Sequence, residues 1–320
     1  MTWETVRKSI DFACSSQNVR IGAFGLFGGE PLLEWALIRK AVEYAEQKYG
    51  IRRFDIATNG LLLSREKILY FIEHNIAPAI SVDGIGIAQD LNRVFGDGRG
   101  SFAILDKKLD ILKGYMDALP KVEIIMSVSP GTVKHVSESI RYLLDKGIRG
   151  KVRFNVRPAI SSMYEWDESS LLEYEKQLFL LGDIFLENYA QGKPINISPH
   201  EDQPVDNYLL KAIELKDSAS CGMGREIMSV SIDGKIYPCY AFASCSKAGK
   251  DEFSLGDVST DSMEEVLKKC TVYGNRHNAC LSCLFWNWSE NASLDEPLDV
   301  YREIYKSWLK VSAYVVRNIV

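Results

Sequence analysis

The sequence predicts an α/β fold in which a barrel-like domain of parallel strands precedes a small cysteine-rich α+β domain. Two observations carry this prediction. Short apolar runs alternate with amphipathic segments of helical length along the first half of the chain, which is typical of repeated βα units. Six of the seven cysteines, in contrast, lie between Cys221 and Cys283. Such clustering in a chain without export features favours metal ligation or thiol chemistry over a disulfide framework.

The expected elements of the first part follow in order. Strands are expected at residues 21–27, 53–57, 77–82, 122–128 and 152–156, and helices at 2–13, 34–49, 64–74, 102–116 and 133–146. Gly50 is suited to end the second of these helices and Ser64 to cap the third. Repeated units of this length imply parallel strands joined by right-handed crossovers.

The chain divides into four expected parts. Residues 1–160 form the partial barrel, 161–219 a proline-containing bridge around a helix at 173–190, 220–295 the cysteine-rich domain, and 296–320 a C-terminal helix. With 320 residues, of which 46% are hydrophobic, the chain can bury a full core.

Composition excludes several classes of function. The formal net charge is -5, and the basic residues are scattered, so neither nucleic acid nor a membrane surface is an expected partner. No apolar run approaches the roughly 18 residues that a membrane span requires. No signal peptide is evident at the start of the sequence, and we expect a cytoplasmic protein. The four histidines form no metal motif, and there is no phosphate-binding loop.

The sequence Gly28-Gly29-Glu30-Pro31 follows the first apolar run and precedes a helix. Two glycines at the end of a strand can bring bare backbone to the floor of a pocket, where the Glu30 carboxylate could receive an ammonium group. The alternative is an ordinary turn from strand to helix, with glycine for the bend and proline at the helix start. The motif by itself does not decide between them.

Further motifs follow in order. They are Ala57-Thr58-Asn59-Gly60, Ser81-Val82-Asp83-Gly84, Asn92-Arg93-Val94 and Gly98-Arg99-Gly100-Ser101-Phe102. Together with Gly28–Pro31, this series over roughly residues 2–295 resembles the radical S-adenosylmethionine (radical SAM) enzymes, in particular the peptide-modifying branch with a C-terminal SPASM domain. The resemblance implies a (β/α)6 barrel that uses S-adenosylmethionine (AdoMet) to form a 5′-deoxyadenosyl radical, which abstracts hydrogen from a peptide.

The resemblance also implies roles for individual residues. Gly28, Gly29, Glu30 and Pro31 would contact the methionine end of AdoMet, Thr58 and Asn59 would border its pocket, and Ser81 and Asp83 would face the ribose. Arg93 could pair with a ligand carboxylate or with Asp90. The pairs Asn59-Gly60 and Asp83-Gly84 are also ordinary turn sequences, so a structural role is the alternative.

The chain departs from the family at its cluster-binding loop. Members carry a CxxxCxxC sequence after the first strand, whose three thiolates hold a [4Fe-4S] cluster, and this sequence contains none. Cys14 is the only early cysteine, and we expect it to be a small buried apolar residue. Counted against the family, the first strand is missing with the loop. The strand at 21–27 would then form a sheet edge, completed by upstream residues or by a strand of a partner or peptide.

The cysteine-rich part resembles a SPASM domain with an incomplete set of cysteines. Cys221 precedes an expected hairpin with an Asp233-Gly234 turn, and Cys239 follows it. A helix capped by Ser262 and Glu265 comes next, and Cys280-Leu281-Ser282-Cys283 follows. Ser289 and Ser293 occupy positions where the family has cysteines.

One metal site is therefore expected in place of two clusters. Cys221, Cys239, Cys280 and Cys283 could together hold Zn(II) or a single [4Fe-4S] cluster. The alternative is a metal-free fold with reduced cysteines. Cys270 is expected to be a packing residue, whereas Cys245 could substitute as a ligand.

Two functions remain open from the sequence. The first is a peptide maturase whose cluster-bearing segment lies upstream of this sequence, with a peptide or protein substrate. The second is a non-catalytic regulatory protein that binds a peptide or partner and keeps a structural metal site. Under either function we expect a truncated or degenerate member of the family that is not active alone. The intact pocket motifs favour the first function, whereas Ser289 and Ser293 favour the second.

Overall fold

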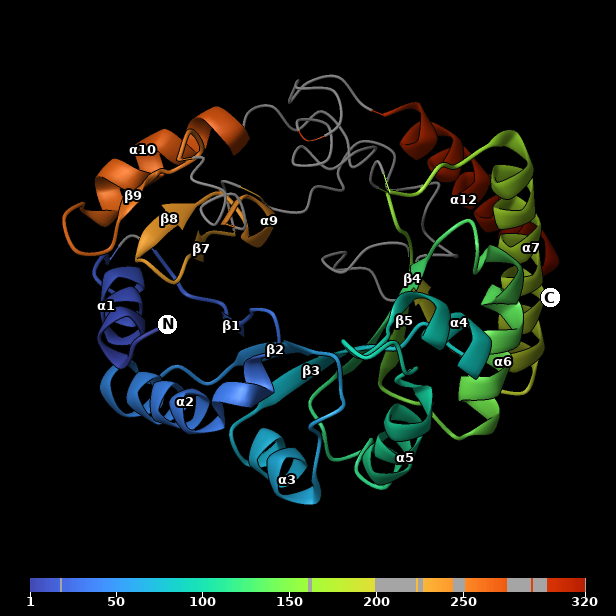
Figure 1. Ribbon diagram of the computed structural model, residues 1–320, viewed down its shortest axis with the longest axis horizontal. Helices are drawn as coiled ribbons and strands as arrows, with labels where there is room; N and C mark the ends of the chain where they lie inside the picture. The colour runs from blue at the N-terminus through green and yellow to red at the C-terminus, as the bar shows by residue number, and fades with distance from the viewer. Residues whose placement is uncertain are drawn as a thin grey trace. The chain divides into compact units, whose positions relative to one another are not determined.

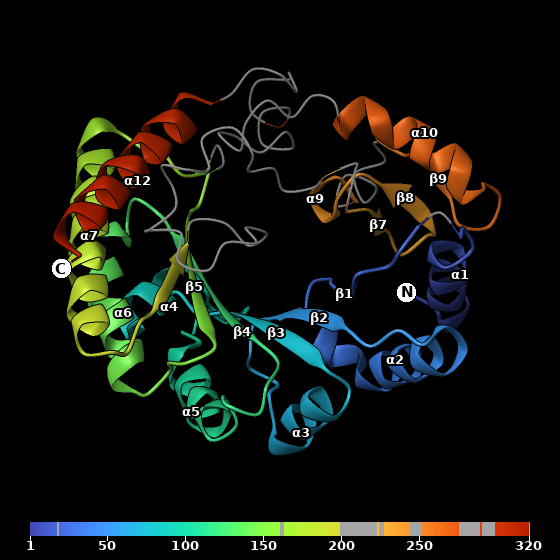
Figure 2. The ribbon, with the colours of Figure 1, turned by 180° about the vertical axis from the view of Figure 1, so that it is seen from behind.

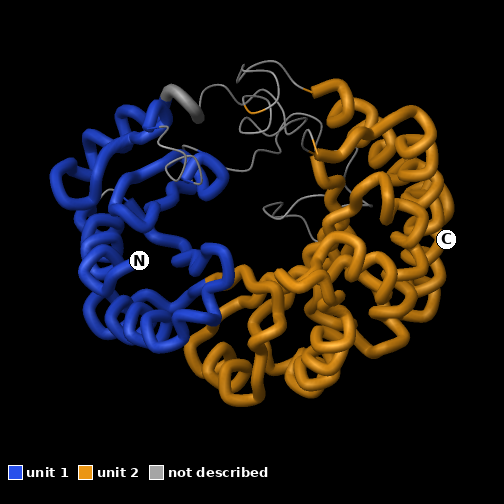
Figure 3. Tube along the Cα trace, viewed as in Figure 1, with its two compact units in different colours: residues 1–54, 217–280 blue, residues 55–216, 281–320 orange. Residues whose placement is uncertain are grey.

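The computed structural model describes residues 1–17, 19–160, 163–198, 223, 227–243, 251–274, 289 and 298–319. The chain forms two compact units, each built from two separate stretches (Figure 3). Unit 1 contains residues 1–54 and 217–280, and unit 2 contains residues 55–216 and 281–320. Each unit is a product of long-range packing, because its two stretches are far apart in the sequence.

The main sheet has six strands in the order β1-β2-β3-β4-β5-β6. They are β1 (Phe24–Leu26), β2 (Phe54–Thr58), β3 (Ile76–Ser81), β4 (Val122–Val128), β5 (Val152–Pro158) and β6 (Asn196–Ser198). Strands β3 to β6 pair in parallel, with Val122 opposite Val152 at the start of the longest ladder. The predicted α/β fold with a parallel sheet is confirmed.

Unit 2 covers its strands with helices (Figures 1 and 2). The helices are α3 (Arg65–Glu73), α4 (Gly86–Asn92), α5 (Phe102–Lys113), α6 (Val136–Asp145), α7 (Glu168–Ala190) and α12 (Asp299–Asn318), with a 3-10 turn η2 (Val133–His135) before α6. The Ser64 side chain accepts a hydrogen bond from Lys67 N, as expected for the cap of α3. Helices α7 and α12 pack together, and the buried Trp308 Nε1 donates to Tyr174 Oη at 3.1 Å.

Two elements of unit 2, strand β6 and helix α4, were not expected from the sequence. Strand β6 lies within residues 161–219, for which the sequence predicts a bridge, and it pairs with β5 through Phe154 and Ile197. Helix α7, which was expected, begins at Glu168 rather than near 173, because Asp167 and Ser170 form a capping box there. Residues 161–219 therefore contribute directly to the parallel sheet.

The N-terminal stretch of unit 1 contains α1 (Trp3–Ala13), β1, the 3-10 turn η1 (Pro31–Glu34) and α2 (Trp35–Tyr49). Helix α2 ends at Gly50, which has the left-handed φ of 67° that a glycine C-cap allows. The Asp11 carboxylate of α1 joins the two helices, since it accepts hydrogen bonds from Tyr44 Oη at 2.6 Å, Tyr49 Oη at 2.8 Å and Lys48 Nζ at 2.9 Å.

The second stretch of unit 1 forms a small α+β structure. Its elements are β7 (Ser229–Val230), β8 (Lys235–Tyr237), α9 (Tyr240–Ala243), β9 (Gly256–Asp257) and α10 (Met263–Gly274). The predicted hairpin is present, with Gly234 at φ 94°, and Ser262 and Glu265 form the predicted capping box at α10. Phe12 of α1 packs into the same core as Ile236 and Val266.

Helix α1 therefore belongs to the core of the cysteine-rich structure and is not a separate appendage.

None of the described helices combines the length and the apolar character needed to span a bilayer.

Candidate functional site

The Gly28-Gly29-Glu30-Pro31 loop of unit 1 exposes its backbone. Gly28 and Gly29 are exposed, and a Cβ placed on either would meet no atom within 4 Å. Glu30 caps η1, with its Oε1 accepting from Leu32 N at 3.0 Å, and Pro31 stands at the first position of that turn. The loop thus presents free space over two glycines beside a fixed carboxylate.

Thr58 and Asn59, in unit 2, shape the turn that follows β2. Thr58 Oγ1 accepts from Gly60 N at 3.1 Å, and Asn59 Oδ1 accepts from Leu61 N at 3.0 Å. Gly60 has a φ of 78°, and a Cβ there would lie 2.9 Å from side-chain atoms of Ile80 and Leu105. The glycine is therefore required by the local packing, and both side-chain oxygens stabilise the turn.

Asp83 lies just beyond the end of β3 and is 3% exposed. Arg93, at the end of α4, donates to it from Nε at 2.8 Å and from Nη2 at 3.0 Å. Asp83 Oδ1 also accepts from Ser127 N at 2.9 Å. Burial raises the pKa of the Asp83 carboxyl, and the charge and hydrogen bonds of Arg93 oppose that rise. Asp83 thus anchors Arg93 from inside the fold.

Asp90, the partner within the chain that the sequence suggested for Arg93, does not pair with it in the structure. Arg93 pairs with Asp83, whereas Asp90 Oδ1 accepts from Phe102 N at 2.7 Å and holds the start of α5. Ser81, the last residue of β3, is half-buried and lies opposite Ile125 of β4. Unit 2 thus brings Asp83 and Arg93 together at the carboxyl ends of its strands.

Sequence reasoning missed two residues of this cluster. Ser127 Oγ accepts from Arg93 Nη2 at 3.1 Å, and Gln89 Oε1 accepts from Asp83 N at 2.7 Å. Gln89 in turn donates to Ser101 Oγ at 3.1 Å. The only sequence signal for Ser127 was a polar residue near the end of a mostly apolar strand. Gln89 lies on α4, which had no recognised start.

Of the four cysteines proposed as metal ligands, only Cys239 lies among the described residues. It lies half-buried between β8 and α9. Cys221, Cys280 and Cys283 lie outside the described residues, as does Cys245. Within the described residues, no three side chains of the metal-binding types come together.

Of the other two described cysteines, Cys270 is buried and Cys14 is half-buried. Cys270 is 2% exposed in the core of unit 1, and burial raises its pKa to about 11, which keeps the thiol protonated. Burial and the nearby Asp11 also raise the pKa of Cys14, which is half-buried at the end of α1.

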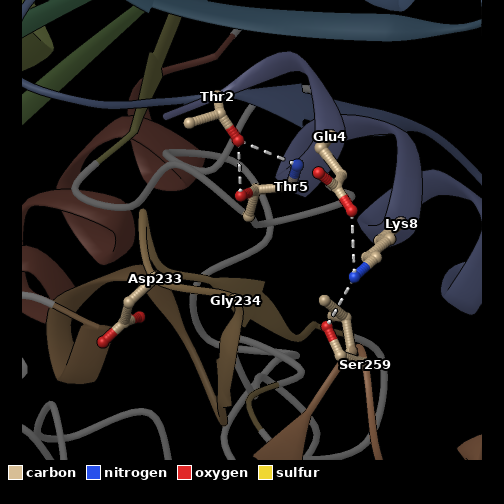
Figure 4. Close-up of a pocket in the computed structure, with 8 residues that line it drawn as sticks. Thr2, Glu4, Thr5, Lys8, Asp233, Gly234 and Ser259 are labelled. Atoms are coloured by element: carbon tan, nitrogen blue, oxygen red, sulfur yellow. Dashed lines mark hydrogen bonds and ion pairs between the residues drawn. The ribbon is translucent and has the colours of Figure 1, made fainter.

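Unit 1 also has a cavity of about 230 Å³ between the start of α1 and the Asp233-Gly234 turn (Figure 4). Lys8 Nζ lies 3.3 Å from Glu4 Oε1 and 3.3 Å from Ser259 Oγ. The Lys8 ammonium in the cavity wall is therefore paired with the Glu4 carboxylate. Asp233 accepts a hydrogen bond from Lys235 N in its own turn. This cavity contains none of the residues expected to bind a ligand.

Residues 221–284 match the model of the SPASM family, described as an iron-sulfur cluster-binding domain. The match begins at Cys221 and includes Cys239, Cys280 and Cys283. This match, together with the relatives and solved structures described next, supports a SPASM-type radical SAM family.

Curated relatives of this chain include anaerobic sulfatase-maturating enzymes of the cysteine type. Those of Clostridium perfringens (strain 13 / Type A) and Clostridium novyi (strain NT) are 24% and 25% identical, over 77% and 76% of the chain. The chain spans 65% and 63% of the length of these relatives. An uncharacterized protein of Methanocaldococcus jannaschii, MJ0907, is 27% identical over 65% of the chain and 68% of its own length.

Solved structures share the fold of this chain. A histidine-tagged form of anSMEcpe with bound AdoMet matches with a TM-score of 0.74 and 21% identity, over 100% of this chain and 87% of that chain. Native anSMEcpe with bound AdoMet and Kp18Cys peptide gives a TM-score of 0.73, over 100% of this chain and 90% of that chain, again at 21% identity. The predicted arrangement of a radical SAM fold followed by a SPASM domain is thus confirmed.

Proposed function

We propose that this protein binds AdoMet and a peptide or protein substrate, as a relative of the anaerobic sulfatase-maturating enzymes. The observation that carries the proposal is the likeness of the whole chain to anSMEcpe structures that hold AdoMet and a peptide. The SPASM match supports the same family of peptide-modifying proteins. The open loop at Gly28–Pro31 supports the cofactor, since its glycines leave room for a ligand.

The chain's own residues would hold AdoMet by simple chemistry. The Glu30 carboxylate would accept hydrogen bonds from the ammonium group of the methionine end, and the bare backbone of Gly28 and Gly29 would allow close approach. Thr58, Asn59 and Ser81 would border the pocket. The contribution of Asp83 would be to position Arg93, because its own carboxylate is buried against that side chain. In this family, bound AdoMet is the source of the radical that abstracts a hydrogen atom from the substrate.

The residues of this sequence do not fit the cluster that cleaves AdoMet. Three thiolates in a CxxxCxxC loop would be needed, and the 320 residues contain no such loop. We therefore expect this polypeptide to bind AdoMet without cleaving it reductively. Cys221, Cys239, Cys280 and Cys283 offer four thiolates, a donor set that fits one structural zinc ion or one [4Fe-4S] cluster.

The test is anaerobic reconstitution of the 320-residue chain with iron and sulfide. We expect AdoMet to bind in isothermal titration calorimetry. We also expect at most one cluster's iron per chain, and no methionine released after addition of dithionite. Failure to bind AdoMet would overturn the proposed cofactor, and steady release of methionine would overturn the assignment of a binding role without cleavage.

The second candidate is a non-catalytic partner or regulator that binds a peptide and keeps a structural metal site. The observation in its favour is the serine at positions 289 and 293, where the family has cysteines, because a serine hydroxyl is a poor ligand for iron. Supplying an upstream CxxxCxxC segment distinguishes the two candidates. A maturase should then cleave AdoMet, whereas a regulator should remain inactive.

A further inference from the structure

Phe27, the residue that directly precedes the Gly28–Pro31 loop, is a large apolar side chain that unit 1 leaves exposed. Exposed positions alternate with half-buried ones along β1, and Phe27 continues the exposed side to which Gly25 belongs. Phe27 itself is 54% exposed. A Cβ placed on Gly25, Gly28 or Gly29 would meet no atom within 4 Å. The backbone on either side of this ring therefore borders open space.

Tyr240, the first residue of α9 in the same unit, holds the Phe27 ring in place. The two ring centroids are 4.4 Å apart and the ring planes are inclined by 30°, which is close to a stacked arrangement. Tyr240 is itself 40% exposed. A ring that was enclosed on both faces could not be half exposed, so Tyr240 covers one face of Phe27 and leaves the other open.

Two other aromatic rings of unit 1 already face a cation. Lys40 Nζ lies 4.2 Å from the centroid of the Trp3 ring, and Lys48 Nζ lies 5.1 Å from that of Tyr44. Among the described residues, no lysine or arginine takes such a position over Phe27. The face of an aromatic ring attracts a cation because it is the negative part of the ring quadrupole. The open face of Phe27 is thus suited to a ligand that brings its own positive charge.

AdoMet carries such a charge at its sulfonium centre. In the proposed function the ammonium group of AdoMet lies on Glu30, and a chain of three carbons joins that nitrogen to the sulfonium sulfur. Phe27 and Glu30 are three residues apart, so their Cα atoms are separated by at most about 11 Å. The two side chains and the carbon chain of the ligand can together cover this distance. The ammonium and sulfonium groups of one molecule can therefore reach Glu30 and Phe27 at the same time.

We propose that Phe27, held in place by Tyr240, binds the sulfonium centre of AdoMet through a cation–π contact. The open face of the ring lies against the carbon atoms bonded to the positive sulfur, while Glu30 accepts hydrogen bonds from the ammonium group. Phe27 thereby favours AdoMet over S-adenosylhomocysteine, which has the same adenosine, ammonium and carboxylate groups but an uncharged sulfur. The inference rests on the proposed function and deepens it, because it names a further AdoMet-binding residue and the property that this residue recognises.

The test compares the affinities of the 320-residue chain for AdoMet and for S-adenosylhomocysteine by isothermal titration calorimetry. We expect the wild-type chain to bind AdoMet about fivefold more tightly, as one partly exposed cation–π contact would give. Phe27→Leu keeps an apolar side chain without a π-system, so it should abolish this preference and leave the affinity for S-adenosylhomocysteine little changed. Phe27→Trp should increase the preference, because tryptophan binds cations best.

Tyr189→Leu in unit 2 is the matched control. Tyr189 is also 40% exposed and also pairs with an aromatic ring, that of Phe185, at 5.9 Å between centroids. The substitution therefore removes an equally exposed aromatic ring far along the chain from the Gly28–Pro31 loop. The ratio of the two affinities should remain that of the wild-type chain.

A second measurement reports on the position of the sulfonium group. A methyl group over the face of an aromatic ring gives an upfield-shifted proton resonance because of the ring current. With AdoMet labelled with carbon-13 at the sulfonium methyl, the bound signal should be shifted upfield in the wild-type chain and in Tyr189→Leu. Phe27→Leu should abolish this shift, and Tyr240→Leu should reduce it, because the Phe27 ring is then no longer held.

Three results would overturn the proposal. The first is equal binding of the two ligands by the wild-type chain, and the second is an AdoMet preference that survives in Phe27→Leu. The third is an equal loss of affinity for both ligands in Phe27→Leu, which would place the ring against an uncharged part of the cofactor. If the wild-type chain binds neither ligand, the proposed function fails as well, whereas AdoMet binding with a preference independent of Phe27 removes this inference alone.

Discussion

The glycine motifs of the two units have different structural roles, although they look alike in the sequence. In unit 1, Gly28 and Gly29 are exposed, and a side chain at either would meet open space. In unit 2, Gly60 and Gly84 have positive φ values of 78° and 121°, and a side chain at either would overlap its neighbours. The first pair leaves room for something outside the fold, whereas the second pair is required by the fold itself.

The acidic residues of the two motifs differ in the same way. Glu30 is half-buried at the start of a short turn, and its carboxylate accepts a backbone hydrogen bond from Leu32 N. Asp83 is buried and is held by Arg93 and Ser127 N. This contrast indicates that the loop of unit 1 is available for a ligand and that the Asp83-Gly84 turn mainly positions other residues. Mutations at the two sites should therefore separate stability from binding.

The largest expected effect is at the buried ion pair of unit 2. Replacing Arg93 with methionine leaves the Asp83 carboxylate without its main partner, and removing one member of a buried pair costs about 3–5 kcal/mol. Urea unfolding should show this loss in Arg93→Met, whereas Arg65→Met at an exposed position on α3 should change stability little. A loss below about 1 kcal/mol would mean that Asp83 does not depend on Arg93.

The next effect is at Gly84. An alanine there must adopt a φ near 121° and would overlap Ser139 Oγ, so we expect a loss of about 3 kcal/mol in the free energy of unfolding. Gly29→Ala in unit 1 is the counterpart, and it should be neutral or slightly stabilising, because the backbone is compatible and the space is open. Equal destabilisation by both substitutions would break the comparison between the two units.

A smaller effect concerns the helices that cover unit 2. Tyr142 of α6 donates to Asp106 of α5, and burial together with that carboxylate raises the pKa of Tyr142 to about 12. The pKa of Tyr142 is higher in the folded protein than the ordinary value of about 10. The protonated side chain therefore contributes fully to the free energy of unfolding below pH 10, and this contribution is lost as the pH rises toward 12.

The loss should be about 1–2 kcal/mol, since the side chain is only partly buried. Urea unfolding between about pH 9 and 11.5 measures it, with Tyr142→Phe as the control that lacks this part of the pH dependence. An identical pH dependence in the two proteins would argue against the Tyr142–Asp106 bond.

Much of the fold follows from local signals in the sequence. The Asp233-Gly234 hairpin and the Ser262 cap of α10 were predictable because a turn or a cap depends on a few adjacent residues. Helix α4 was missed because it begins at a glycine and has no side-chain cap. Strand β6 has only three residues, Asn196–Ser198, too few to show a period.

The candidate site was less predictable than the fold. The sequence named Asp83 and Arg93, but it offered a ligand carboxylate or Asp90 as the partner of Arg93 and did not choose Asp83. That choice depends on how α4 packs over the ends of β3 and β4, which no local pattern encodes. Ser127 was missed for the same reason, since its contact with Arg93 depends on where α4 ends above β4.

The most direct measurement is AdoMet binding by a protein in which the open space of unit 1 is filled. Gly29→Val adds a branched side chain where the loop has room, and Gly22→Val, at another exposed glycine with no neighbour within 4 Å, is the matched control. Calorimetric titration should show at least tenfold weaker binding of AdoMet by Gly29→Val, unchanged binding by Gly22→Val, and wild-type unfolding free energies for both. Wild-type affinity in Gly29→Val would contradict the assignment of this loop to AdoMet.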